Sequence, residues 1–234
     1  AGLSKSPSIF DIKKLTWMNS EYLKAMDFDK YFELARPKLE EALAGTDLDL
    51  KKIAALLQMR LETLNDIPRL VDFFKELPDY STELYTHKKM KTNDEIALSS
   101  LQAALPVLEN LSDWNETAIH DSLMALVGEL GIKNGQLLWP VRTALSGEQT
   151  SPGGAMELAD ILGKVLGRPA LRGIGGIRDG LALLQRMGEA ALDIAQADDH
   201  IGQGANMLGR LAGILIGQRI NGDMRILLGN GGRN

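Results

Sequence analysis

One stretch of the sequence gathers residue types that bind planar or anionic groups. Residues 135–154 read GQLLWPVRTALSGEQTSPGG and place Arg142 on a predicted helix, followed by a short loop. The loop ends in four residues that should open the next helix: Ser151, Pro152, Gly153 and Gly154. The serine is a good N-cap and the proline a good first helical residue. The two glycine amides would then lie bare at a helix start, where the helix dipole attracts negative charge.

Arg142 precedes this expected helix start by a short loop, so its side chain could converge on the same spot. The five donors of an arginine suit a phosphate or the edge of a base. Trp139 and Pro140 offer a flat surface on which an unstacked RNA base could stack. The same spacing also fits an ordinary helical hairpin with a good cap, in which Arg142 lies in solvent and Trp139 in the core. Spacing alone leaves both interpretations open.

The elements that must position these residues are predicted to be helices. The apolar residues of a helix expected over residues 10–26 share one face: Leu15, Met18, Tyr22 and Met26. Gly131 and Gly163 are expected to end later helices. The alternating β-branched residues that are typical of strands are absent, so the expected fold class is all-α.

Composition and charge narrow the function classes. The 234 residues are 44% hydrophobic and 24% charged, as in ordinary globular proteins. Cysteine is absent, which excludes disulfides and thiolate chemistry and is compatible with a reducing compartment. No secretion signal and no apolar run of roughly 18 residues is present, so we expect a cytoplasmic location and no membrane contact. The net charge of −5 gives no hint of a nucleic acid by itself.

The composition changes near residue 164. Residues 165–234 hold 15 of the 24 glycines but no lysine and no aromatic residue. We therefore expect helical subdomains over 1–80 and 81–164, and then a Gly/Arg-rich helical tail over 165–234. The tail is either a helical extension with its own surface chemistry or a segment of separate origin. Its helix at 202–220 carries three glycines at four-residue spacing, which allows close approach to another helix: Gly209, Gly213 and Gly217.

No catalytic or metal-binding motif is present. His87, His120 and His200 are far apart, and no HExxH or Cys/His spacing exists. GIGGIRDG, from Gly173, misses the spacing of the dinucleotide fingerprint, and no predicted strand precedes it. Neither a phosphate-binding GxxxxGK[ST] loop nor a GxSxG nucleophile motif is present. We therefore assign no catalytic residue and no metal ligand.

Three motifs resemble segments of bacterial glutamyl-tRNA synthetases, in the order of that family. SPSIFDIKKLTWMNSEYL at 6–23 resembles the segment that follows the catalytic domain, and LLQMRLETLNDIP at 56–68 resembles the LxxRxxTLxE segment. Residues 131–164, beginning GIKNGQLLWPVRTALSGEQTSPGG, resemble the stretch KxGQxxxPxRxALTGxxxTPG of the C-terminal domain. The resemblance therefore covers about Ser6 to Lys164, the C-terminal, anticodon-binding half of the family.

This resemblance implies an all-α cage that grips the anticodon loop of tRNA, with glutamate tRNA as the expected partner. The subdomains over 1–80 and 81–164 would both bind the anticodon, the first with a start like the family's stem-contact segment. Arg60 matches the arginine that reads the third anticodon base, and Arg142 the one that contacts the middle base. The helix start that meets the first base has serine in place of threonine: Ser151, Pro152, Gly153 and Gly154. Lys133, Gln136 and Trp139 are possible stacking or positioning residues.

The family's nucleotide-binding fold, with its HIGH and KMSK-type signatures, is absent from this chain. ATP and Mg²⁺ would belong to that missing domain, so no cofactor is expected here. The chain would then support glutamate attachment to tRNA without catalysing it. The alternative is a helical protein-interaction or structural module whose tail mediates association through residues 202–220.

Overall fold

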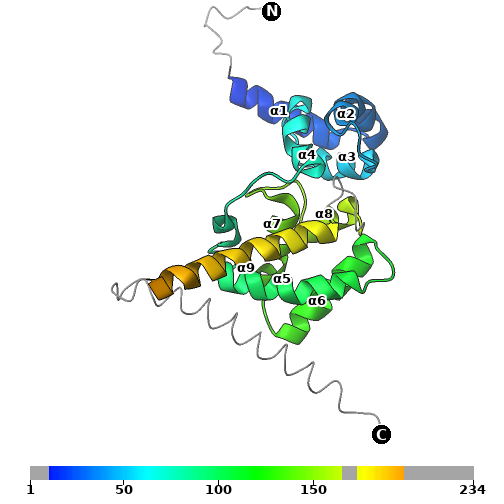
Figure 1. Cartoon of the computed structure of the whole chain (residues 1–234). Helices are drawn as coiled ribbons and strands as arrows, with labels where there is room; N and C mark the ends of the chain where they lie inside the picture. The colour runs from blue at the N-terminus through cyan, green and yellow to red at the C-terminus, as the bar shows by residue number, and fades with distance from the viewer. Residues whose placement is uncertain (1–10, 165–172, 198–234) are drawn as a thin grey trace, which may run out of the picture.

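The structure, a computed structural model, describes residues 11–164 and 173–197 as α-helices joined by loops and short 3-10 turns. The first group of helices comprises α1 (Ile12–Ala25), α2 (Phe28–Ala42), α3 (Leu50–Gln58) and α4 (Ile67–Lys75), with η1 (Leu64–Asp66) before α4. The second comprises η2 (Thr82–Tyr85), α5 (Asp94–Glu109), α6 (Glu116–Leu130), α7 (Asn134–Ser146), α8 (Ala155–Leu162) and α9 (Gly173–Ala197). Figure 1 shows these groups as two bodies, α1–α4 above α5–α9. The all-α prediction is confirmed, since β pairing in the described ranges is limited to an isolated bridge between His87 and Thr92.

Aspartates start the helices of the first body. The carboxylates of Asp11, Asp27 and Asp49 accept hydrogen bonds from backbone N–H groups in the first turns of α1, α2 and α3. These groups would otherwise lack a partner, so each cap stabilises its helix by about 1 kcal/mol. Behind the caps, α2 packs against α3 and α4 around fully buried side chains, including Tyr31, Leu57 and Phe74.

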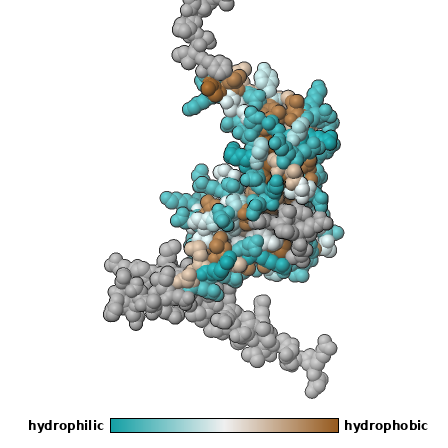
Figure 2. Space-filling view, turned by 45° about the horizontal axis from the view of Figure 1, so that its top comes forward, coloured by the Kyte–Doolittle hydropathy of each residue, from teal (hydrophilic) through white to brown (hydrophobic). Residues whose placement is uncertain are grey.

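Of the four apolar residues predicted to share a face of the first helix, Met26 packs against this core and the other three are exposed. Leu15, Met18 and Tyr22 are 51%, 40% and 69% exposed, whereas Leu23 is buried. Figure 2 shows such apolar residues on the surface next to the grey N-terminal trace. Side chains tie the helix to α3 and its following loop instead, since Asn19 donates to the carbonyl of Glu62 and Gln58 to that of Leu23. The predicted helix is confirmed, and most of its apolar face lies on the surface of the described part of the chain.

The second body is built around α7. This helix packs against α5, α8 and α9, and its residues 140–146 are all buried, as is the following Gly147. The helices around it end as the sequence predicts, because Gly131 and Gly163 follow α6 and α8 with φ angles of +62° and +72°. Most residues avoid this left-handed region, and glycine adopts it without a steric penalty.

Part of the glycine-rich tail belongs to the second body. The helix predicted to start at Ile177 begins at Gly173, and α9 buries Ile174, Ile177 and Leu184 in the same core as α5 and α7. A Cβ atom on Gly176 would lie 2.9 Å from the carbonyl oxygen of Ala144, so only glycine fits this helix crossing. Residues 202–220, on which the association hypothesis rests, lie outside the described residues.

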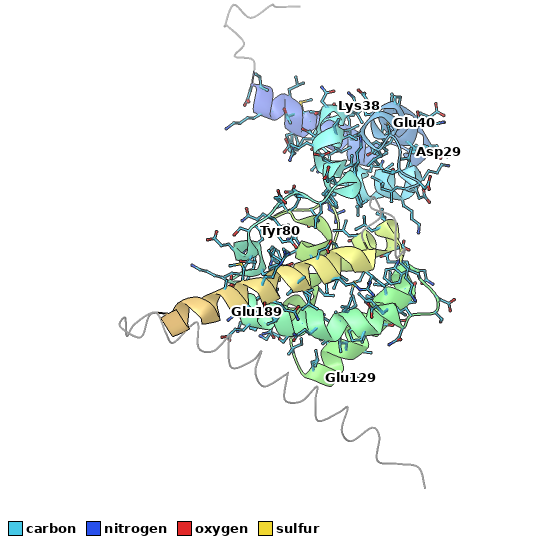
Figure 3. All side chains as sticks on the ribbon, viewed as in Figure 1. Asp29, Lys38, Glu40, Tyr80, Glu129 and Glu189 are labelled. Atoms are coloured by element: carbon cyan, nitrogen blue, oxygen red, sulfur yellow. The ribbon has the colours of Figure 1, made fainter. Side chains whose placement is uncertain are left out.

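Two tyrosines form the wall against which α9 lies. The hydroxyls of Tyr80 and Tyr85 are 2.9 Å apart, and both lie within reach of a Cβ placed on Gly180. Figure 3 shows the labelled Tyr80 beside α9. Burial raises the pKa of Tyr85, so its hydroxyl stays protonated and remains available as a hydrogen-bond donor.

The hydropathy of the helices sets one further limit on the fold. Within residues 11–164 and 173–197, no helix combines the length and the apolar character that crossing a membrane requires.

Neighbouring glycines of α9 provide a matched test of its packing. Gly176→Ala should lower the free energy of unfolding by about 1–3 kcal/mol, because the new methyl group meets the backbone of α7. Gly175→Ala should raise it by up to about 1 kcal/mol, since nothing lies within 4 Å and alanine favours the helix. Urea denaturation followed by circular dichroism measures both variants. Equal effects of the two substitutions would contradict the packing of α9 described here.

Candidate nucleic-acid interface

Arg142 lies inside the protein, where it holds the loop between α7 and α8. Its side chain is only 9% exposed. One terminal nitrogen, Nη1, donates to the hydroxyl of Ser151 at 2.8 Å. The other, Nη2, donates to the carbonyl oxygens of Glu148 and Gln149 at 3.2 and 3.0 Å. The guanidinium therefore closes the loop through three hydrogen bonds.

The indole ring of Trp139 packs against the same guanidinium. The Cζ atom of Arg142 lies 4.2 Å from the centre of the Trp139 ring, in cation–π geometry. Such contacts contribute up to about 2 kcal/mol when they are removed from water. The ring of His87 lies 4.0 Å from the same indole, whose N–H donates to the carbonyl of Leu84 at 2.9 Å. Trp139 therefore already has protein partners on its ring and its N–H. The alternative of an ordinary helical hairpin with Arg142 in solvent is wrong, because Arg142 is buried.

Burial changes the pKa of Arg142. Loss of hydration lowers its pKa from the ordinary value, and the carboxylate of Glu148 partly opposes this effect. A charge that is removed from water must be surrounded by acceptors, or burying it costs several kcal/mol. The two loop carbonyls and the Ser151 hydroxyl supply those acceptors, while Nε is buried without a partner.

The helix expected to open at Ser151 begins at Ala155 instead. The Ser151 hydroxyl is already engaged, since it accepts from Arg142 and donates to the carbonyl of Gly153 at 2.7 Å. Gly154 is the N-cap, and its N–H donates to the Glu157 carboxylate at 2.6 Å. Glu157 reaches back from the third helical position, as in a capping box. The prediction of a cap at Ser151 is wrong, and the amide of Gly154 is not bare.

Gly153 joins this loop to the first body. It is buried, and a Cβ atom there would lie 3.1 Å from the side chain of Leu56 on α3. Arg60 follows α3, and its Nη1 donates to the carbonyl of Leu56 at 2.9 Å while its side chain is exposed. A continuous series of contacts thus runs from Arg142 through Ser151, Gly153 and Leu56 to Arg60. These contacts connect the two predicted arginines with the 151–154 segment, and we call this set of residues the rim; Arg60 is exposed there, whereas Arg142 and Gly153 are buried.

A groove of about 410 Å³ lies beside Arg60, between α3 and helices α6 and α8. Its charged and flexible lining comes from both bodies: Lys52, Met59, Arg60, Glu116, Glu157 and Asp160. Lys52 and Asp160 form an ion pair across it, with Nζ and Oδ2 2.7 Å apart. The groove therefore presents donors, acceptors and an exposed thioether to whatever enters it.

Lys133 and Gln136 lie at the other end of α7 from the loop. Gln136 accepts from the backbone N–H of Lys133 at 3.0 Å and donates to the carbonyl of Lys91 at 3.3 Å. Lys133 itself is exposed. The structure thus places these residues beside the turn at 86–92 rather than beside Arg60.

For metals, no group of three or more His, Asp or Glu residues suitable for an ion lies in the part of the chain that the structure describes.

Residues 30–167 match the family model for the anticodon binding domain. This match covers more than half of the chain. The chain belongs to the anticodon binding domain family. The resemblance inferred from the three sequence motifs is therefore confirmed, and the helical cage is the fold of this domain.

Relatives of the anticodon binding domain described here are bacterial glutamate–tRNA ligases. Those of Clostridium acetobutylicum and Clostridium botulinum strain Hall are 52% and 55% identical over 162 residues. Each alignment covers 69% of this chain and 33% of the relative, so the chain spans about a third of their length. A solved glutamate tRNA ligase from Elizabethkingia meningosepticum matches with a TM-score of 0.58 and 22% identity. The match covers 75% of this chain and 33% of the ligase, and it supports the all-α fold.

Two functional features were missed at the sequence level. The cap by Glu157 carries a local signal, because a glutamate three residues after an N-cap is the mark of a capping box. The contact of Leu56 with Gly153 carries none, since these residues are distant in sequence and meet only through packing.

Two substitutions of Glu157 separate capping from general surface effects. Glu157→Ala should lower the free energy of unfolding by about 1 kcal/mol, because the Gly154 amide loses its acceptor. Glu157→Gln should lose much less, since its amide oxygen can accept the same hydrogen bond. Thermal and urea unfolding would measure both. An alanine variant with the same free energy of unfolding as the unmodified chain would show that the cap does not stabilise the fold.

Proposed function

We propose that this anticodon binding domain binds the anticodon loop of a tRNA, with glutamate tRNA as the partner. The observation that carries the proposal is the rim, in which a series of contacts connects Arg60 with Arg142 and residues 151–154. An exposed guanidinium beside loop carbonyl and amide groups offers the donors and acceptors that base edges require. The names of the relatives point to glutamate tRNA among the possible partners.

The two arginines contribute differently. Arg60 donates one hydrogen bond to the Leu56 carbonyl, and its exposed guanidinium also lines the groove between the bodies. Arg142 uses three N–H bonds inside the protein, so its first role is to shape the loop. Its unpartnered Nε is buried, so we infer that Arg142 acts on a bound base through the loop that it shapes.

The wider activity is part of the same proposal. The relatives are about three times as long as the aligned part, and their names describe ligases. We infer that this domain supports glutamate attachment by holding tRNA, while a separate region binds ATP and Mg²⁺. A cytoplasmic location follows from the same proposal, because charging of tRNA supplies protein synthesis.

Arg60→Ala provides the direct test. It should weaken binding of a glutamate tRNA anticodon stem-loop about tenfold or more, because losing a good base contact costs roughly 1–3 kcal/mol. The fold should persist, since the side chain is exposed and bonds only one carbonyl. Fluorescence anisotropy at fixed salt measures the affinity.

Arg36→Ala is the matched control, because Arg36 is an exposed arginine on α2 that pairs with Glu40 at 2.7 Å. This variant should bind like the unmodified chain. Equal affinities of the two variants would remove Arg60 from the interface. Failure of the unmodified chain to bind any tRNA stem-loop would remove the proposed function itself.

A further inference from the structure

A short turn bearing three lysines lies against the start of α7. Backbone hydrogen bonds between His87 and Thr92, at 3.1 and 3.2 Å, close the turn, and Lys88, Lys89 and Lys91 on it are exposed. We call these three residues and Lys133 the lysine cluster. The cluster has no assigned role in the fold, since all four side chains are exposed.

The turn is held firmly on α7. Gln136 donates to the carbonyl of Lys91 at 3.3 Å, only three residues beyond Lys133. Met90 packs on Gly135, where its sulfur lies 2.8 Å from the position of an added Cβ. These contacts place the turn that carries Lys88, Lys89 and Lys91 beside the N-terminal end of α7, which Lys133 precedes. Like charges repel each other, so this gathering works against folding unless an anion offsets it.

Protein partners do not supply that anion. Lys24 and Lys52 form ion pairs with Glu21 and Asp160, whereas no ion pair joins the cluster to an acidic group within the described residues. Asp94, just beyond the turn, is half-buried at the start of α5, and burial raises its pKa. The cluster is therefore a local positive patch on a chain whose net charge is −5.

Lys91 has a backbone conformation that lysine rarely adopts. Its φ angle is +57°, the one positive value at a non-glycine residue in the part of the chain that the structure describes. The left-handed region costs an ordinary residue about 1–2 kcal/mol, and asparagine or glycine fits it better. Strain of this kind persists where the surrounding structure holds it in place, and it is enriched at functional sites.

The cluster lies along the helix that carries the proposed rim. His87, at the base of the turn, contacts Trp139, and Trp139 supports Arg142. Nine residues separate Lys133 from Arg142, which is about 14 Å along a helix axis. An RNA whose loop lies on the rim can therefore reach the cluster with its backbone.

We propose that the lysine cluster binds the phosphate backbone of the RNA whose loop bases contact the rim; this inference rests on the proposed function. An ammonium group is a compact point charge without the planar fork of arginine, so it suits phosphate rather than a particular base. Phosphate contacts position an RNA and carry no sequence information. The cluster thus adds affinity and orientation, while base selection stays at the rim.

Salt dependence tests the inference. Lys88→Gln with Lys89→Gln should weaken binding of every anticodon stem-loop by a similar factor. It should also lower the slope of log affinity against log salt by about 2, because each phosphate contact contributes about 1. Lys30→Gln with Lys38→Gln is the matched control on α2, where Lys30 is exposed and Lys38, labelled in Figure 3, is half-buried. This control should leave the slope unchanged.

Lys91→Asn separates a binding role from a structural one. The thermal midpoint should stay the same or rise by a few degrees, since asparagine tolerates the left-handed backbone. RNA affinity should fall, because one ammonium group is lost. A lower midpoint with unchanged affinity would show that Lys91 serves the fold, and would overturn its part in the proposal.

The outcomes distinguish the two proposals. If Arg60→Ala weakens binding but the double lysine variant keeps both affinity and slope, the lysine cluster is not part of the interface and the proposed function stands. If the unmodified chain binds no stem-loop, both proposals fail. A sequence-dependent loss in the lysine variant would also overturn the phosphate assignment, since it would indicate base contacts.

Discussion

The buried guanidinium of Arg142 is the constraint on which the interface depends. A charge that is nearly removed from water needs acceptors at fixed positions, and the loop after α7 provides them. Meeting that need sets the path of the loop backbone and engages the hydroxyl of Ser151. The same path presses Gly153 on Leu56, so one buried charge also shapes the contact between the two bodies.

Close backbone approach is the second physical theme of the structure. Gly153 lets the loop meet α3, and Gly176 lets α9 cross α7 against a carbonyl oxygen. A side chain at position 176 would meet the backbone of α7 and push α9 away, whereas one at position 153 would have to displace the side-chain ends of Leu56 and Leu158. The glycine-rich composition beyond residue 164 therefore has a packing role in α9, which lies in the same core as helices from the lysine-containing part.

An acidic chain can still present a surface suited to RNA, because electrostatic attraction depends on where charges lie. The exposed arginine at the groove and the lysine cluster beside α7 are local features, and Glu116, Glu157 and Asp160 also line the groove. The excess of carboxylates lies in residues 1–132, with 22 acidic and 15 basic side chains. Attraction at such patches falls with salt, and repulsion from the acidic remainder limits non-specific binding.

The sequence by itself determined the helical class, the glycine stops at Gly131 and Gly163, and the family, because periodicity, caps and motifs are local properties. Only the tertiary structure decided where α8 begins. Ser151 is a good cap in isolation, but Arg142 occupies its hydroxyl and Glu157 then caps the helix at Gly154. Likewise, periodicity marked an apolar face on α1 without showing whether it is covered. Competition for an acceptor and burial of a face both depend on side chains outside the local helix, so they are decided only when the helices pack.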